Sequence, residues 1–458
     1  MAQAAPSEQG LLLSYYGDDF TGSTDAMEAL AMAGVPTVLF LEHPTPAMLA
    51  RFPEVRCVGL AGSSRGRSPE WMREHLSASF AALARLGAPL LQYKICSTYD
   101  SSPALGSIGC AIDIGVAQMG GRWSPTIVGA PRLKRYQVFG NLFAAVDGVG
   151  YRLDRHPTMS RHPVTPMDEA DLRLHLRGQT GRRIELIDMV QLRQGGGDAA
   201  LEALRGPDAP VVFIDVCDDD TLLAAGRLVW QACAEPTFSA SSSGLDYALV
   251  AHWRAAGMLP DAAGFAPAEA VDTIAAVSGS CSPVTAAQIA WARQHGFDVI
   301  RIDIAKALRT GSRDAEVERV LALAQAALAR GASPLVCSAE GPDDPAVLGF
   351  AESAREAGMA RHEAARAVGT TLASVMRGLL DRCPVQRIVV AGGDSSGEVA
   401  AALDIAALSV LCPMAPGAPL CRAWSDDPRR DGLQIVLKGG QIGARSFFTD
   451  VLHGAGSM

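Results

Sequence analysis

The chain of 458 residues lacks the features that are typical of membrane, secreted and nucleic-acid-binding proteins. No apolar run reaches the ~20 residues of a membrane span, and the N-terminus lacks the basic-then-apolar pattern of a signal peptide. The 40 Lys and Arg residues are outnumbered by 49 Asp and Glu residues. The net charge of -9 at pH 7 argues against nucleic acid or an anionic membrane as the main partner. We therefore expect a cytoplasmic protein that binds a small molecule.

Several familiar chemical signatures are also absent. The ten cysteines are scattered without a C-x-x-C pair and the nine histidines form no ligand pattern, so we expect reduced thiols and leave the metal site unknown. The sequence has no G-x-x-x-x-G-K-[ST] loop, no G-x-G-x-x-G motif and no G-x-S-x-G elbow. These absences argue against a Walker-type nucleotide site, a dehydrogenase and a serine hydrolase.

Apolar, strand-like runs alternate with helix-like stretches, which predicts an α/β fold of mostly parallel sheets flanked by helices. The length exceeds what one core usually serves, and a region rich in Gly, Pro and Ala places a boundary near 255–270. We therefore expect two domains, 1–255 and 270–458. The predicted strands are 11–16, 36–41, 55–61, 89–95, 126–130, 210–216, 273–277, 298–304, 334–338, 386–391 and 433–438. The predicted helices are 69–86, 107–119, 284–295, 314–330 and 361–380.

Two segments of the first half interrupt this alternation. Residues 131–168 are rich in aromatic, basic and proline residues, and we predict a long irregular segment there. Long irregular segments in compact domains are usually lids or binding loops, with a solvated insert as the alternative. Residues 236–244 are rich in serine and predict a loop.

Paired carboxylates follow the first predicted strand. Where that strand ends and a helix starts, the chain reads Gly17-Asp18-Asp19-Phe20-Thr21-Gly22-Ser23-Thr24-Asp25. Ligands of open α/β sheets bind at such points. Adjacent Asp side chains suit a general base, a Mg²⁺ ligand or a contact to a sugar hydroxyl. The alternative is that one of them only caps the helix. We take Asp19, and then Asp18, as the candidate catalytic residues.

Two more polar clusters follow strands of the first half. One reads Lys94-Ile95-Cys96-Ser97-Thr98-Tyr99-Asp100, and the other reads Gly62-Ser63-Ser64-Arg65-Gly66-Arg67. Because the ends of parallel strands share one edge of a sheet, we expect these groups to converge on a hydroxylated carboxylate, with the cations binding its carboxylate. The candidate substrate-binding residues are Arg65, Lys94, Ser97, Thr98 and Asp100. An ordinary turn followed by a helix cap is the alternative for the Lys94 segment.

Three small-residue loops follow apolar runs in the second half. Small residues let the backbone approach phosphates, and free amides donate to them. Each loop alone could be a simple connection, but three in one domain favour phosphate or nucleotide binding. The candidate residues are Ser278, Ser280, Gly392, Gly393, Asp394, Ser395 and Gly440.

These motifs resemble the four-carbon acid sugar kinase family over nearly the full length of the chain. The resemblance rests on Gly17-Asp18-Asp19-Phe20-Thr21-Gly22-Ser23, Lys94-Ile95-Cys96-Ser97-Thr98-Tyr99-Asp100-Ser101, Ser278-Gly279-Ser280-Cys281-Ser282, Gly392-Gly393-Asp394-Ser395-Ser396-Gly397 and Leu437-Lys438-Gly439-Gly440-Gln441-Ile442-Gly443. It implies that 1–255 binds the acid sugar, that 270–458 binds ATP with Mg²⁺, and that a terminal hydroxyl is phosphorylated.

The segment after residue 130 departs from the family pattern. Ala130-Pro131-Arg132-Leu133-Lys134-Arg135-Tyr136 stands where a G-R-x-T is usual. This departure predicts a divergent subgroup, so that a branched acid such as 3-oxo-isoapionate joins threonate, erythronate and 3-oxo-tetronate as a candidate substrate. The alternative function is a non-catalytic sugar-acid binding or regulatory protein on the same fold. The oligomeric state stays open, with a homodimer as one option.

Overall fold

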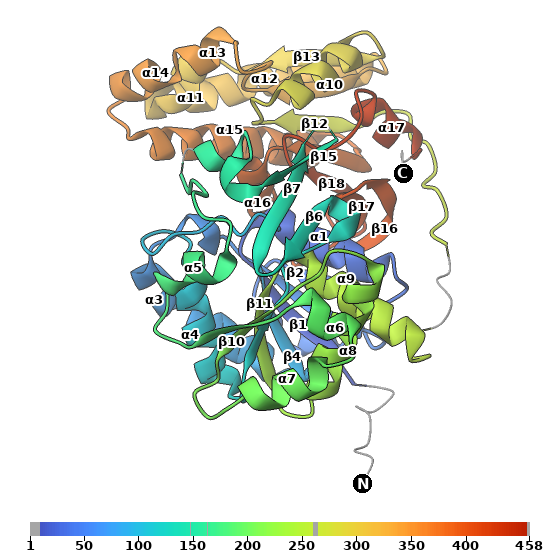
Figure 1. The fold of residues 1–458 in the computed structure, drawn as a ribbon. Coiled ribbons are helices and arrows are strands. Elements are labelled where there is room, and N and C mark those ends of the chain that lie inside the picture. Colours follow the sequence, from blue (N-terminus) through green and yellow to red (C-terminus); the bar gives the residue numbers. More distant parts are fainter. Residues whose placement is uncertain (1–9, 147, 163, 260–263, 456–458) are drawn as a thin grey trace. The chain divides into compact units, whose positions relative to one another are not determined.

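The computed structural model describes residues 10–146, 148–162, 164–259 and 264–455, and the side chain of Asp394 lies outside this description. The chain divides into two compact units, Met1–Ala263 and Gly264–Met458. Each unit is an α/β arrangement with a mostly parallel sheet flanked by helices, which confirms the predicted fold class (Figure 1). Within the described ranges, no helix combines the length and apolar character that a membrane crossing requires.

The central sheet of the first unit is parallel, with the strand order β11-β4-β1-β3-β2. Its strands are β1 (Leu13–Gly17), β2 (Thr37–Phe40), β3 (Cys57–Ala61), β4 (Leu90–Lys94) and β11 (Thr237–Ser241). The first four overlap the predicted runs. The loop predicted at 236–244 is wrong, because β11 and the start of a helix occupy that stretch.

Helices cover both faces of this sheet. The helices of the first unit are α1 (Phe20–Ala31), α2 (Pro46–Leu49), α3 (Pro69–Ala84), α4 (Ile108–Met119), α5 (Leu172–Arg177), α6 (Met189–Arg193), α7 (Gly197–Leu204), α8 (Asp219–Ala232) and α9 (Ser243–Ala255). The Tyr15 hydroxyl donates to the Ser23 carbonyl of α1, while the Tyr16 ring packs edge-on against Phe80 of α3. Since successive strand residues point to opposite faces, α1 and α3 lie on opposite sides of the sheet.

Two small sheets complete the first unit. One is parallel, with β5 (Ser124–Thr126), β9 (Ile184–Ile187) and β10 (Val211–Ile214). The other is antiparallel, with β6 (Arg135–Val138), β7 (Asn141–Val146) and β8 (Val149–Arg152). The segment predicted to be irregular thus contains two β-hairpins. The first turns at Phe139 and Gly140, whose φ angles of 49° and 77° are typical of a tight hairpin.

The sheet of the second unit has the strand order β16-β17-β18-β15-β12-β14-β13. Its strands are β12 (Ala275–Ser278), β13 (Phe297–Arg301), β14 (Ser333–Cys337), β15 (Arg387–Ala391), β16 (Ala407–Ala415), β17 (Ala418–Trp424) and β18 (Gln434–Lys438). The five strands predicted from the apolar runs pair in parallel, and the unpredicted β16 and β17 form an antiparallel hairpin that pairs with β18.

The helices of the second unit are α10 (Pro283–Arg293), α11 (Ile304–Leu308), α12 (Thr310–Ala329), α13 (Pro345–Leu348), α14 (Phe350–Glu356), α15 (Arg361–Arg382), α16 (Gly393–Ala402) and α17 (Phe447–His453). The helices predicted at 284–295, 314–330 and 361–380 correspond to α10, α12 and α15. The residues of β12, β14 and β15 are all buried, as parallel strands covered on both faces require. The core can therefore hold the strand ends, and the loops that follow them, in fixed positions.

Candidate functional site

The carboxyl ends of β4, β1 and β3 bring three predicted clusters together. Gly17 pairs with Ala61 on one side and with Lys94 on the other. Backbone hydrogen bonds then join the loops, since the Asp18 amide donates to the Lys94 carbonyl and the Arg65 amide donates to the Asp18 carbonyl, each at 2.9 Å. The sheet therefore supplies the common edge that the sequence predicted.

The guanidinium of Arg65 contacts both paired aspartates. Its Nε and Nη2 atoms donate to the two oxygens of Asp18 at 2.9 and 2.7 Å, and its Nη1 donates to Asp19 Oδ2 at 2.7 Å. Burial raises the pKa of Asp18 to about 6, against the opposing effect of Arg65. The Asp18 side chain is 6% exposed and that of Asp19 is 29% exposed, so Asp19 is the more accessible carboxylate.

Asp19 also caps helix α1. Its Oδ1 atom accepts a hydrogen bond from the Gly22 amide at 2.7 Å. A Cβ atom at Gly22 would stand 2.5 Å from Asp19 Oδ1, 3.5 Å from Arg65 Nη2 and 3.6 Å from Lys94 Nζ. The cap and the ion pair therefore coexist, and both cations approach the helix at the position that has no side chain.

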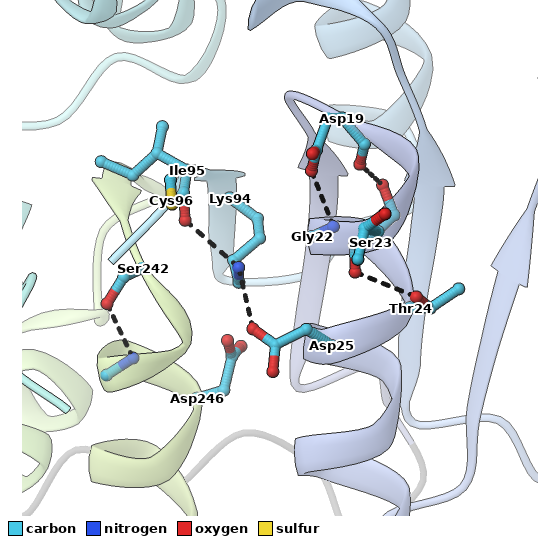
Figure 2. A network of polar contacts seen from close by, with 12 residues as sticks. Asp19, Gly22, Ser23, Thr24, Asp25, Lys94, Ile95, Cys96, Ser242 and Asp246 are labelled. Carbon is cyan, nitrogen blue, oxygen red and sulfur yellow. Dashed lines mark hydrogen bonds and ion pairs between the residues drawn. The ribbon is translucent and has the colours of Figure 1, made fainter. Parts of the chain in front are cut away.

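A second cation of this edge, Lys94, faces two carboxylates (Figure 2). Its Nζ atom lies 3.1 Å from Asp25 Oδ2 and donates to the Ile95 carbonyl at 3.2 Å. Asp246 of α9 lies on the other side of the ammonium group and interacts electrostatically with it. Asp246 is fully buried, its Oδ1 atom has no hydrogen-bond partner among the described residues, and burial raises its pKa to about 7.

Neither Asp25 nor Asp246 is among the predicted site residues. Asp25 ends the first motif, one helical turn after its glycine. Asp246 stands four residues after the Ser242 cap, in a helix whose core-facing residues are otherwise apolar or small. A carboxylate on the buried face of a helix was the only signal in the sequence for Asp246, and it does not indicate the partner.

The remaining predicted residues of the first unit occupy the loop after β4. Thr98 Oγ1 donates to Asp100 Oδ1 at 2.5 Å and lies 2.9 Å from Cys96 Sγ, while Ser97 is half-buried. Tyr99 between them is buried and has a φ of 56°. Such a conformation costs a bulky residue ~1–3 kcal/mol and is enriched at ligand sites. The loop is thus held in one strained shape beside the two cations.

The three predicted loops of the second unit also share one edge. The strand register places Ser278, Ala391 and Lys438 side by side at the ends of β12, β15 and β18. A Cβ atom at Gly440 would stand 2.5 Å from Ser280 Oγ, and one at Gly392 would stand 3.3 Å from the Ser280 amide. The loops therefore touch through positions where only glycine fits.

Further side chains that the prediction did not include hold the Gly440 loop. Ser282 Oγ and Thr285 Oγ1 both donate to the Gly440 carbonyl, the latter at 2.8 Å. Gln288 Nε2 lies 3.0 Å from each of three carbonyls, those of 442, 443 and 444. Lys438 Nζ donates to Thr285 Oγ1 at 3.2 Å, and burial lowers the pKa of this lysine to about 8.

Helix α16 starts at the exposed Gly393, directly after Gly392, whose φ is 124°. Among the described side chains, none caps its first turn. Ser395 Oγ would lie 3.3 Å from a Cβ atom at Gly392, so this predicted residue is beside the loop. Asp394 belongs to the same turn, but its side chain is outside the described residues. Open helix N-termini favour anions.

The described residues line a cavity outside the predicted site and form no metal-binding cluster. A cavity of about 410 Å³ lies between α3 and α4, lined among others by Arg73, Ser107 and Asp113, and it includes none of the predicted site residues. No group of three or more His, Cys, Asp or Glu residues in the described part of the chain is arranged to hold a metal ion. The described cysteines are all free thiols.

Comparison with known families identifies the class of protein. Residues 13–249 match the family described as a sugar-binding N-terminal domain, and residues 275–448 match the one described as a nucleotide-binding C-terminal domain. The chain therefore belongs to this two-domain family, the four-carbon acid sugar kinases.

Named relatives confirm that the chain is a sugar-acid kinase. A Paraburkholderia graminis protein named 3-oxo-isoapionate kinase is 68% identical over 445 residues, which cover 97% of this chain and 95% of the relative. A Cupriavidus necator protein named 3-oxo-tetronate kinase is 31% identical, with 97% of both chains covered.

Solved structures share the fold. A Salmonella typhimurium LT2 protein described as a tRNA synthase superposes with a TM-score of 0.77 at 26% identity, covering 95% of this chain and 98% of that one. A Haemophilus influenzae protein gives a TM-score of 0.71 at 22% identity, with the same coverage, and supports the fold alone.

Proposed function

We propose that the protein transfers the γ-phosphoryl group of ATP to a hydroxyl of 3-oxo-isoapionate in the cytoplasm, as a step of carbohydrate metabolism. The first unit binds the acid sugar and the second binds the nucleotide. The observation that carries the proposal is the pair of strand-end sites, one rich in carboxylates and one built from glycine and serine backbone. The 68% identity to the Paraburkholderia graminis kinase favours the branched sugar acid over the four-carbon acids.

In the first unit, Asp19 positions or deprotonates the attacking hydroxyl. The new bond joins that oxygen to the γ-phosphorus, the bond to the β-phosphate oxygen breaks, ADP leaves and the hydroxyl proton passes to the carboxylate. Arg65 fixes the position of Asp19, because its Nη1 atom donates to Asp19 Oδ2 at 2.7 Å while its other two nitrogens donate to Asp18. Phosphoryl transfer depends mainly on such positioning. Lys94, Ser97, Thr98 and Asp100 form the rest of the sugar site.

In the second unit, the loops after β12, β15 and β18 cradle the ATP phosphates. Gly392 and Gly440 bring these loops into close contact at Ser280, and the first turn of α16, which no described side chain caps, adds backbone donors. The cradle residues are Ser278, Ser280, Gly392, Gly393, Asp394, Ser395 and Gly440. Mg²⁺ accompanies ATP and neutralises charge on the phosphates. It usually keeps several waters and takes one or two carboxylates, and we assign it no residue.

The test measures ADP release with Mg-ATP and each of 3-oxo-isoapionate, 3-oxo-tetronate, threonate and erythronate. We expect the highest kcat/KM with 3-oxo-isoapionate. The alternative of a non-catalytic binding protein predicts that sugar acids raise the melting temperature without ADP release. Sedimentation of the same preparation checks the homodimer, which stays a prediction.

A further inference from the structure

The charges at the sugar site leave one cation unmatched. Arg65 contacts Asp18 and Asp19, and Lys94 faces Asp25 and Asp246. Each of these cations thus faces two carboxylates of the chain itself, and Figure 2 shows the two that face Lys94. A sugar carboxylate placed there would be repelled by more negative charge than the cation supplies.

Arg135, at the start of β6, has a different environment. Its Nη1 atom donates to the carbonyls of Leu133, Lys134 and Ala145 at 3.0, 3.3 and 3.4 Å. Its Nε atom is buried and has no hydrogen-bond partner, and among the described residues no carboxylate forms an ion pair with it. A buried guanidinium nitrogen without an acceptor is costly unless a ligand supplies one.

The titratable groups that face Arg135 do not neutralise it. Cys96 lies within electrostatic range, and burial raises the pKa of its thiol to about 11, so the sulfur is uncharged near neutral pH. His156 is the other neighbour. Burial lowers its pKa, and its Nδ1 atom accepts from the amides of Thr158 and Met159 at 3.2 Å each. The imidazole is therefore neutral as well.

Cys96 also locates Arg135 relative to the sugar site. This thiol lies within electrostatic range of Arg65, Lys94 and Arg135, and its sulfur is 2.9 Å from Thr98 Oγ1. Arg135 thus approaches the same strained loop from the β6–β7 hairpin. Among the described residues, Arg135 is a cation near this loop that forms no ion pair with an aspartate.

We propose that Arg135 binds the carboxylate of the sugar acid and so selects acid sugars over neutral ones, an inference that rests on the proposed function. Arg65 and Lys94 then hold the aspartates that contact the hydroxyls, rather than the carboxylate. The hydrogen bonds that Arg135 forms with described residues all come from Nη1, and its buried Nε has no partner there, so the Nε–Nη2 edge, the fork that grips a carboxylate with two hydrogen bonds, faces no acceptor of the described chain.

The test compares 3-oxo-isoapionate with its carboxamide in wild-type, Arg135→Gln and Arg135→Lys enzyme, with exposed Arg161→Gln from the same segment as the matched control. We expect Arg135→Gln to raise KM for the acid about tenfold or more. The KM for the amide and for ATP should change little, so the preference for the acid is lost. Arg135→Lys should keep part of that preference, and Arg161→Gln should keep all of it.

Equal losses for the acid and the amide would assign Arg135 a structural role and overturn the proposal, as would an unchanged preference. If Arg135→Gln does not fold, the preference of Arg135→Lys decides, because lysine retains the charge but not the fork. If Arg135→Lys then prefers the acid over the amide as strongly as the wild type does, this result would count against the proposal. A wild-type enzyme that phosphorylates none of the sugar acids would instead refute the proposed function, which keeps the two failures distinct.

Discussion

Replacing Gly440 with alanine should weaken ATP binding and leave sugar binding unchanged. The added Cβ atom would stand 2.5 Å from Ser280 Oγ and 3.3 Å from both Ser282 Cβ and Ser282 Oγ. Gly440 cannot simply move away, because Ser282 and Thr285 both donate to its carbonyl. The substitution therefore forces apart two loops that we assign to the phosphates.

The size of the effect follows from these contacts. A displacement that disrupts both hydrogen bonds to the Gly440 carbonyl, at ~0.5–1.5 kcal/mol each, destabilises the loop arrangement by about 1–3 kcal/mol. If ATP binds only the original arrangement of the loops, the dissociation constant rises by about 5- to 150-fold. The KM for the sugar acid should stay near that of the wild type, since the site assigned to the sugar lies in the other unit.

Calorimetric titration of ATP into the wild type and the variants measures this effect. Gly311→Ala is the matched control, because Gly311 lies in helix α12 with nothing near its Cβ position. Ser280→Ala removes the oxygen closest to the added methyl group. Adding Gly440→Ala to Ser280→Ala should therefore weaken ATP binding less than adding it to the wild type does. ATP binding by Gly440→Ala with wild-type affinity would refute the cradle at this loop.

Three further predictions concern the first unit. Asp19→Asn should keep the helix cap, since Asn caps as well as Asp, but should lower kcat by ~10²–10⁴; activity near the wild-type level would remove Asp19 from the mechanism. Lys94→Met should lower the free energy of unfolding by about 3–5 kcal/mol in urea melts, because it leaves Asp25 and Asp246 without their cation, and an unchanged midpoint would count against that cluster. Asp246→Asn should gain stability relative to the wild type as the pH rises from 5 to 8. The folded pKa of Asp246, about 7, lies above the unfolded value, so ionisation destabilises the wild type through this window; a pH-independent difference would contradict the assignment.

The sequence predicted the strands whose apolar character is local. Strands β12 to β15 and β18 are short runs of aliphatic residues between polar stretches, and all were predicted. Strand β11 was missed because its serines depend in part on distant partners. Ser239 Oγ donates to the Pro125 carbonyl at 2.8 Å, and the Ile127 amide donates to Ser241 Oγ at 2.8 Å. Those partners are 114 residues away and leave no trace in the local pattern.

The same distinction separates the predicted from the unpredicted parts of the site. Asp18 and Lys94 end neighbouring strands, so a parallel sheet brings them together without further information. Asp246 reaches Lys94 from a helix about 150 residues later in the chain, and that pairing depends on how α9 packs on the sheet. The environment of Arg135 depends on a hairpin whose turn includes a positive φ at Phe139, a residue type that does not predict one.

Electrostatics alone gives the two units different ligand preferences. In the first, Asp18, Asp19, Asp25 and Asp246 outnumber the cations that contact them, and burial raises the pKa of two of these acids, so the cluster suits hydroxyl groups and the uptake of a proton. In the second, buried Lys438 has hydroxyl and carbonyl partners and, in the part of the chain that the structure describes, no ion-paired carboxylate. A buried cation at the end of β18, together with close-packed glycine loops and a helix terminus that no described side chain caps, favours a polyanion. This second environment suits the phosphates of ATP. The first suits the hydroxyls of a sugar acid, whose carboxylate needs a cation that is not paired with an aspartate, the role that we propose for Arg135.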